Sequence, residues 1–479
     1  MSPSPSSAAR PAAEPSAADA VPRTAWLALF VTTLVFFLVV IDISAVNVAF
    51  PSIASEFGTT TAQLSWIISG YNITVGALLL VAGRLADSLG RKRLFIPAVA
   101  VFLLGSVLCG LAPNRGLLIA ARVLQATGGA VLSPTAVAVV LPDFPPNKRS
   151  TAIGILGATG GLGAVFGPAL GSIAIDLWSW RGVFLINVPI CLLVLAVSPR
   201  LLRESKNPDA TGRIDLVGVV IGTAAIASIM FGIVESEHWG ITDPRVIALI
   251  VTGLALVPML LRRSARHPEP LLELPLFEHR SFAAAVAGVA LYSLGFTSGA
   301  LTSSLLLQEA WSQPITTTGK ALIISPLLSA AAAPLSGRLA DRVGHRWILA
   351  AGCLCSALGY VLYLILLTPT PAVWTRFVPI STLVGLGTGV TIATWSSAGL
   401  SDISPARFGT ANATIRTAQQ VFYAFGVSVV VILLASGDGD GGLQGFRWAW
   451  IWIIGTYVAS AVTIGLMFPA GSSHDRAAR

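Results

Sequence analysis

The stretch GRLADSLGRKR at residues 83–93 recurs as GRLADRVGHRW at residues 337–347, and the first five letters of the two copies are identical. Each copy comes directly after a long apolar run. Two further positions match at the same offsets, Gly90 with Gly344 and Lys92 with Arg346. Because the letters, the offsets and the position after an apolar run all agree, we interpret the two copies as an internal duplication rather than as a chance recurrence.

Apolar runs long enough to cross a membrane occur along nearly the whole chain. Of its 479 residues, 54% are hydrophobic and 11% are charged, and the mean hydropathy is +0.79. Soluble globular proteins carry about 25% charged residues, and a membrane-spanning helix needs about 20 apolar residues. The composition excludes disorder for most of the chain and disfavours a large water-soluble enzyme. We expect fourteen spanning helices, at residues 25–48, 63–87, 93–112, 116–141, 150–176, 181–199, 214–235, 245–261, 281–309, 317–340, 347–368, 373–400, 407–435 and 447–469.

The duplication and the number of spans together predict an all-α integral membrane protein with two six-helix bundles. The copies follow the second and the tenth expected helices, so helices 1–6 correspond to helices 9–14, and helices 7 and 8 are an insertion. Two parallel halves of this kind form a transporter with its site between them near the membrane midplane. The expected divisions are a disordered tail at 1–23, the first bundle at 24–201, a linker with helices 7 and 8 at 202–280, the second bundle at 281–469 and a second tail at 470–479.

Basic residues are distributed unevenly between the two sides of the expected helices. With the N-terminus inside, 22 of the 30 lysines and arginines fall in cytoplasmic segments and 6 fall on the outer side. Cytoplasmic loops carry such an excess, so we expect a multi-pass protein of the plasma membrane with both termini in the cytoplasm. The net charge of +8 arises in these loops and does not indicate nucleic acid. The first tail does not resemble a signal peptide, because no apolar core follows its Arg10 until Trp26.

Five segments in chain order carry the motifs of one transporter family. They are IDISAVNVAFPSI at 41–53, GRLADSLGRKR at 83–93, RVLQATGGA at 122–130, GLGAVFGPALGS at 161–172 and WSWRGVFLINVPI at 178–190. Together they resemble the fourteen-helix drug:proton antiporters of the major facilitator superfamily, and the likeness covers nearly all of 25–469. The chain departs from the family pattern at Gly171-Ser172, where two glycines are usual, and at Gln419-Gln420, where relatives often have Arg-Gln before a glycine pair.

Asp42 and Arg122 are charged residues well inside expected helices 1 and 4. Charge at such depth costs about 2.5–3.5 kcal/mol on insertion scales, and it is normally functional. Both residues lie at a similar depth in the same half, so we predict that they interact and that Asp42 carries a coupling proton. The alternative is a static pair that fixes helix packing. Gln125, one turn beyond Arg122, and Asn47 are candidates to contact substrate or extend the network, and ordinary interhelical hydrogen bonding is an equal alternative.

The two GRLAD copies are candidates for a conformational lock. Glycine permits tight turns and close backbone approach, and an aspartate can cap a neighbouring helix or bind arginine. The resemblance implies a charge lock that stabilises the outward-open state and breaks when the halves rock. The alternative, basic residues that only hold the loops inside, explains neither the acids nor the glycines. The candidate residues are Gly83, Asp87, Gly90, Arg91, Gly337, Asp341, Gly344 and Arg346.

Expected helix 5 is rich in glycine around a proline. Small residues let helices approach closely, and a proline within a helix bends it. The resemblance implies a tight seam between the halves that resists leakage, and ordinary glycine-mediated packing is the alternative. We therefore assign a conformational role to Gly163, Gly167, Pro168 and Gly171.

Polar and aromatic side chains at depth are candidates for the substrate cavity. Aromatic rings stack on planar or cationic compounds, although many Trp and Tyr residues are interfacial anchors. Arg416 suits an anionic or zwitterionic substrate, or it pairs with Asp402 or with a carbonyl oxygen. The candidates are Asn47, Tyr71, Gln125, Tyr292, Trp395, Arg416, Gln419 and Tyr423.

The sequence therefore predicts a proton-driven exporter of amphiphilic small molecules such as drugs, antibiotics or natural products. No GxxxxGK[ST] string is present, so direct ATP hydrolysis is not expected,. We expect a monomer in the lipid bilayer that binds protons and a small-molecule substrate, with no cofactor, metal or nucleic acid. The alternatives are export of lipids or metabolites, proton-coupled uptake, a membrane-embedded enzyme, which needs a cluster of catalytic groups, and a non-transporting scaffold.

Overall fold

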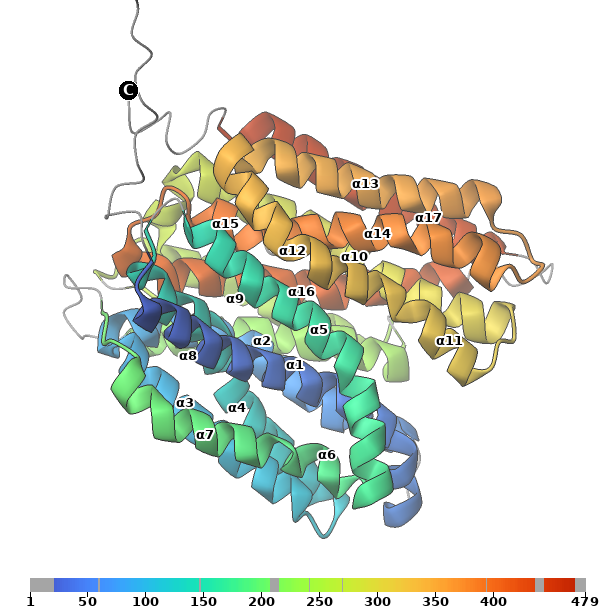
Figure 1. Ribbon diagram of the computed structural model, residues 1–479, viewed down its shortest axis with the longest axis horizontal. Coiled ribbons are helices and arrows are strands. Elements are labelled where there is room, and N and C mark those ends of the chain that lie inside the picture. Colours follow the sequence, from blue (N-terminus) through green and yellow to red (C-terminus); the bar gives the residue numbers. More distant parts are fainter. Residues whose placement is uncertain are drawn as a thin grey trace, which may run out of the picture.

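The computed structural model describes residues 21–58, 61–145, 148–206, 215–240, 242–268, 270–392, 394–435 and 443–469, and these residues form helices and short connections without strands (Figure 1). The predicted tails lie outside the described residues, apart from 21–23 at the start of the chain. The first half contains α1 (Arg23–Phe57), α2 (Thr61–Leu89), α3 (Arg91–Gly110), α4 (Arg115–Val140), α5 (Arg149–Leu177), α6 (Arg181–Leu185) and α7 (Asn187–Leu201).

The remaining helices follow the same order after an inserted pair. The insertion contains α8 (Leu216–Trp239) and α9 (Pro244–Ser264). The second half contains α10 (Arg280–Leu305), α11 (Ile315–Leu322), α12 (Ile324–Val343), α13 (His345–Leu366), α14 (Val378–Ile392), α15 (Thr394–Leu400), α16 (Phe408–Ala435) and α17 (Gln444–Met467).

The predicted spans correspond to these helices in order. Thirteen stretches of the described chain are long and apolar enough to cross a membrane, and α5 occupies the remaining predicted span. The all-α membrane fold is therefore confirmed. Three predicted spans are interrupted, since the sixth consists of α6 and α7, the tenth of α11 and α12, and the twelfth of the turn η6 (Val373–Phe377) with α14 and α15. The predicted end of the first span at 48 is too early, because α1 continues to Phe57 and stops at Gly58, which has φ 57°.

Packing within the two halves repeats. In the first half α1 packs on α5, α4 packs on both α2 and α3, and α3 packs on α7. In the second half α10 packs on α16, α14 packs on both α12 and α13, and α13 packs on α17. Each pair in the first list has its counterpart in the second. Figure 1 shows α3, α4, α6 and α7 on one side of the molecule and α13, α14 and α17 on the other, with α1, α5, α12 and α16 between them.

Two helix pairs make the most extensive contacts between the halves. They are α5 with α12 and α2 with α16. The duplication relates α2 to α12 and α5 to α16, so it exchanges the two pairs, as a two-fold relation between the halves requires. The inserted helices α8 and α9 pack on each other, and α8 also contacts α2 and α16.

The halves approach most closely where the GRLAD copies end α2 and α12. A Cβ atom on Gly83 would lie 2.6 Å from the carbonyl oxygen of Gly409, and one on Gly337 would lie 2.5 Å from the carbonyl oxygen of Ser150. Gly409 and Ser150 are each the second residue of a helix, α16 and α5 respectively. Glycine is required at both sites because any side chain would push the two backbones apart.

Candidate functional site

Asp42 lies in α1, and its carboxylate contacts Arg122 of α4. Arg122 Nη1 donates to Asp42 Oδ2 at 2.5 Å, and the two side chains are 1% and 0% exposed. The Arg122 guanidinium lies over the ring of Tyr71 in α2, with its central carbon 4.2 Å from the ring centroid, which is a cation–π arrangement. The sequence predicted an interaction between Asp42 and Arg122, and the structure places them in direct contact.

Two amide side chains complete the coordination of the carboxylate. Gln125 Nε2 donates to Asp42 Oδ1 at 2.9 Å, and Gln125 Oε1 accepts from Arg122 Nη1 at 2.6 Å. Asn187 Nδ2 in α7 also donates to Asp42 Oδ1 at 2.9 Å. Both amides donate to Ser106 Oγ in α3, at 2.7 Å from Gln125 and 3.1 Å from Asn187. We call these six buried residues the acid network: Asp42, Tyr71, Ser106, Arg122, Gln125 and Asn187.

Sequence reasoning missed Asn187 and Ser106. Asn187 stands within the segment WSWRGVFLINVPI, where it interrupts an apolar run, and Ser106 interrupts the run of α3. Polar residues inside a spanning helix tend to face the bundle interior, so this signal was present. The network also extends to Cys109, whose Sγ lies 3.9 Å from Gln125 Oε1. The side chain of Asn47, the remaining polar candidate in α1, lies outside the described part of the chain.

The acid network suits an ionised carboxylate. Every side-chain contact to the two Asp42 oxygens comes from a donor, and an arginine supplies the opposite charge. A buried ion pair is tolerated only when such additional hydrogen bonds satisfy it, and removal of one partner leaves an uncompensated charge. A proton added to Asp42 would replace one acceptor by a donor and would therefore disturb its contacts to α4 or α7.

The first GRLAD copy makes hydrogen bonds to the other half. Asp87 Oδ1 and Oδ2 accept from the backbone N–H groups of Gly409 at 3.1 Å and Thr410 at 2.6 Å, at the start of α16. Arg91 pairs with Asp87 at 2.8 Å. Arg91 also donates to the carbonyl oxygens of Pro405 at 2.5 Å and Ala406 at 3.1 Å in the other half. The carboxylate thus caps a helix of the second half while the arginine binds the loop before that helix.

The described residues of the second copy make different contacts from those of the first. Gly344 has φ 95° and Gly90 has φ 111°, so both copies use glycine for a backbone that other residues rarely adopt,. Arg346 donates to the carbonyl oxygen of Gly465 within its own half, so the expectation that it holds the opposite half is corrected. The side chain of Asp341 lies outside the described part of the chain. The contact across the halves here joins Ser150 Oγ and His345 Nε2, 3.2 Å apart.

The linker after α9 adds a third element at this end. Glu273 pairs with Arg84 of α2 and, at 3.4 Å, with Arg407 just before α16. Arg84 and Arg407 belong to different halves, so one carboxylate of the linker bridges both. No sequence pattern indicates this bridge, because Glu273 is distant from both arginines along the chain.

The glycines of α5 make their closest contacts within the first half. Cβ atoms on Gly163, Gly167 and Gly171 would meet Val40, Ser44 and Ala45 of α1. The resemblance implied a seam between the halves at these positions, and this expectation is corrected. The seam of α5 with α12 lies nearer the start of α5, where a Cβ on Gly154 would lie 2.9 Å from the carbonyl oxygen of Ala333. The side chain of Pro168 lies outside the described part.

The predicted cavity residues of the second half separate into two groups. Tyr292 and Trp395 are buried in the aromatic interior, with ring centroids 5.9 Å apart. Tyr423 lines a cavity of about 260 Å³ between α2, α8, α10 and α16. Arg416 donates to Gln419 at 3.1 Å and lies 5.8 Å from the ring centroid of Phe36 in the first half. Among the described residues no ion pair reaches Arg416, so the alternative of pairing with Asp402 is not what the structure contains.

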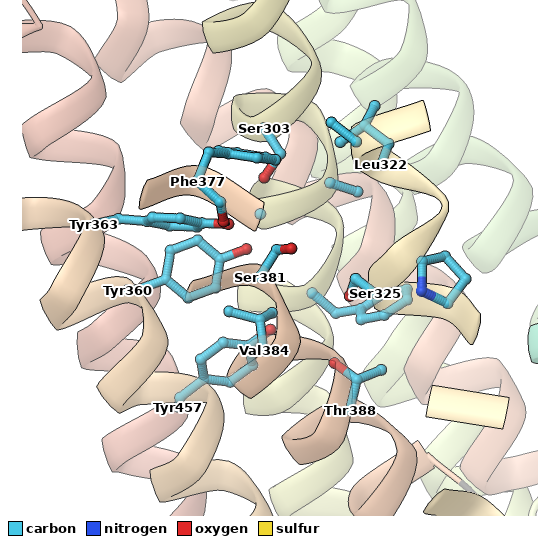
Figure 2. Close-up of a pocket in the computed structure, with 15 residues that line it drawn as sticks. Ser303, Leu322, Ser325, Tyr360, Tyr363, Phe377, Ser381, Val384, Thr388 and Tyr457 are labelled. Carbon is cyan, nitrogen blue, oxygen red and sulfur yellow. The ribbon is translucent and has the colours of Figure 1, made fainter. Parts of the chain in front are cut away.

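A second cavity, of about 230 Å³, lies inside the second half. Its walls come from α10, α11, α12, α13, η6, α14 and α17, and none of the fifteen described residues that line it is charged. Figure 2 shows the hydroxyl groups of Ser303, Tyr360, Tyr363 and Ser381 directed toward one another. Over the described residues, no group of three or more His, Cys, Asp or Glu side chains is placed to hold a metal ion.

Two duplicated helical halves, a buried acid–arginine pair and hydrogen bonds that cross between the halves are features of a membrane transporter. The family model described as "Major Facilitator Superfamily" matches residues 32–427 and 284–478. The chain belongs to this superfamily.

Relatives and solved structures agree with that assignment. The chain is 32% identical to the puromycin resistance protein pur8 of Streptomyces alboniger over 409 residues, which cover 85% of this chain and 81% of pur8. It is 34% identical to the multidrug resistance protein Stp of Mycobacterium tuberculosis, covering 71% of this chain and 63% of Stp. The structure resembles that of the transporter FucP in the outward conformation, with a TM-score of 0.64 at 15% identity, over 94% of this chain and 100% of FucP.

Proposed function

We propose that this transporter exports amphiphilic small molecules in exchange for protons across the cytoplasmic membrane. The observation that carries the proposal is the buried Asp42–Arg122 pair with its two amide donors. An ionisable group so deep in a membrane protein normally marks an ion or substrate pathway. The relatives named as puromycin and multidrug resistance proteins support export as the direction.

The proposed cycle couples the acid network to the lock. When Asp42 is ionised, its contacts to α4 and α7 hold the first half together as described here. A proton on Asp42 releases at least one of these donors, and the helices that carry them are then free to shift. The positive-inside bias supports placing the GRLAD ends in the cytoplasm with both termini. The Asp87–Arg91 lock then closes the cytoplasmic side in this conformation, so substrate leaves outward.

Inside-out membrane vesicles with an imposed pH gradient test the coupling. Radiolabelled puromycin is the first cargo to try, because of the relative that bears its name. We expect wild type to accumulate puromycin only with the gradient and to lose the accumulation with an uncoupler. Asp42→Asn should insert normally and accumulate none. Accumulation by Asp42→Asn equal to wild type would contradict the proposal, and accumulation only in right-side-out vesicles would indicate uptake.

Asp243→Asn is the matched control for this experiment. Asp243 caps the start of α9 by accepting from the backbone N–H of Arg245 at 2.8 Å, and asparagine caps a helix equally well. The substitution removes one carboxylate from the protein without touching the acid network. We expect its transport to equal that of wild type.

A further inference from the structure

The uncharged cavity of the second half occupies the place that the acid network occupies in the first. The copies of GRLAD are separated by 254 residues, and this shift relates α2 to α12 and α3 to α13. The close contacts of Ser150 and Gly409 relate α5 to α16 by a shift of 259 residues, and we apply the same shift to α4 and the η6–α15 stretch. With these shifts, residues of and beside the acid network fall on cavity-lining residues: Tyr71 on Ser325, Ser106 on Tyr360, Cys109 on Tyr363, Arg122 on Ser381 and Gln125 on Val384.

Glycine contacts check this alignment independently. Gly105 approaches Gln125 closely, and Gly359, which is its counterpart, approaches Val384. Gly128 approaches the backbone of Phe102, and its counterpart Gly387 approaches the backbone of Ser356. The backbones therefore superimpose through this region, and the difference lies in the side chains. Where the first half is filled by an ion pair and amides, the second half has tyrosines around a space.

We propose that this space is a binding site for an uncharged, planar aromatic group of one or two fused rings that carries a hydroxyl or carbonyl oxygen. The proposal rests on the proposed export function, and it names the class of substrate. An engineered cavity of about 150 Å³ holds benzene, so the 230 Å³ available here admits a larger ring system. The walls include the rings of Phe296, Tyr360, Tyr363, Phe377 and Tyr457, which offer faces and edges for stacking.

The polar groups of the site select oxygen without charge. Ser303, Tyr360, Ser381 and Thr388 place hydroxyl groups on the cavity wall (Figure 2), and a hydroxyl group both donates and accepts. Burial of a charged ligand group among neutral side chains is costly, and the fifteen described residues of the lining provide no counter-ion.

The site adjoins the cavity between the halves. Phe296 lines the site, and its ring centroid lies 5.5 Å from that of Tyr423, which lines the larger cavity beside α2 and α8. The two cavities are thus separated by this ring pair, and a shift of either ring would connect them. The acid network of the first half would then bind the proton, and the equivalent cavity of the second half would bind the substrate.

Equilibrium dialysis of the purified full chain tests the site without any gradient. The probes are radiolabelled 2-naphthol, naphthalene and naphthalene-2-sulfonate, each with excess unlabelled compound to define the saturable part. We expect one saturable site for 2-naphthol and at least 10-fold weaker binding of the sulfonate. Ser325→Phe, which fills the cavity, should abolish the binding. Ala351→Phe, which adds the same ring to the exposed surface of α13, should leave it unchanged.

Tyr360→Phe keeps the shape and removes one hydroxyl group. We expect 2-naphthol to bind about 3- to 10-fold more weakly, as the loss of one hydrogen bond predicts, and naphthalene to bind as in wild type. This variant decides the matter if Ser325→Phe fails to fold. Wild type without saturable binding, Ser325→Phe with wild-type binding, or sulfonate bound as tightly as 2-naphthol would each overturn the proposal. Because no gradient is present, a failure of proton coupling leaves these results unaffected.

Discussion

Equivalent helices of the two halves enclose different interiors. In the first half they meet at Asp42 and Arg122, where two amides donate to one carboxylate oxygen of Asp42 and Arg122 donates to the other. In the second half their counterparts meet at a cavity lined by tyrosine and serine hydroxyl groups. The comparison shows that the same duplicated backbone can enclose either a buried ion pair or an uncharged cavity, and that a few side chains decide which one forms. A buried charge requires the complete set of partners, and only the first half supplies it.

Arg122→Leu is the most severe way to break the charged side of the comparison. It leaves the Asp42 carboxylate buried without its counter-ion, which destabilises a protein by about 3–5 kcal/mol. We expect a large fall in the thermal unfolding midpoint in detergent and no transport. The double variant Asp42→Asn with Arg122→Leu should recover most of the midpoint and none of the transport. Recovery of transport would mean that the pair only fixes packing.

Arg91→Gln tests whether the hydrogen bonds of the first GRLAD copy hold the two halves together at this end. It removes the hydrogen bonds to Asp87 and to the loop before α16, and hydrogen bonds to charged groups contribute about 1.5–3 kcal/mol. We expect the closed GRLAD end to open. Electron-paramagnetic distances between spin labels at Arg93→Cys and Arg342→Cys, both exposed and in different halves, report the change.

Arg346→Gln is the comparison variant for this measurement. Its contact to the carbonyl oxygen of Gly465 stays within one half, so the label distances should match those of wild type. Equal opening by both variants would show that the contacts of Arg91 to the other half do not hold this end closed.

Asn187→Leu sharpens the boundary of the acid network. The substitution removes one of the two donors to Asp42 Oδ1 and one partner of Ser106, and a lost buried partner costs about 1–3 kcal/mol. We expect a moderately lower thermal midpoint and weaker proton-driven transport than in wild type. An unchanged midpoint together with unchanged transport would place Asn187 outside the network.

Glu56→Gln should give the smallest effect. Hydrogen bonds from Arg181 and Trp180 lower the pKa of Glu56 below its ordinary value of 4.5, and the residue joins α1 to α6 near the surface. A lowered pKa means that the pair stabilises the folded protein at neutral pH and loses this effect as the pH falls below about 4.5,. Exposed pairs contribute about 0.2–1 kcal/mol, so the midpoint should fall slightly at pH 7.

The same measurement at acid pH is the control for Glu56→Gln. Once Glu56 is protonated, the wild type has also lost the charge, so the two midpoints should converge. A difference that grows as the pH falls would contradict the assigned direction of the pKa shift.

The sequence predicted those parts of the site that depend on charge. Asp42 and Arg122 stand out because charge is rare in apolar runs, and the repeated GRLAD letters locate the ends where the halves meet. Neutral polar site residues are harder to predict, because the sequence does not show which face of the helix Asn187 or Ser106 occupies. Tyr71 was expected in a cavity, but its ring lies over Arg122 instead. The sequence alone does not distinguish an aromatic residue that lines a cavity from one that packs on an arginine.

The sequence also did not predict which helices pack against each other. A run of glycines indicates that another helix packs closely but does not identify that helix. Gly163, Gly167 and Gly171 were therefore expected between the halves, whereas they pack on α1 within the first half. The cavity of the second half was invisible for a related reason. An empty space depends on the sum of side-chain volumes from seven helical segments, and no local pattern in any one of them reports it.

The bridge at Glu273 changes how the two inserted helices should be regarded. Since this residue follows α9 and pairs with both Arg84 and Arg407, the inserted segment links the two halves by ion pairs as well as by the chain itself. A shortened twelve-span version that joins α7 directly to α10 would keep both halves intact yet lose these ion pairs. Under the proposed cycle, we expect such a version to favour the opening of the GRLAD end more than the full chain does.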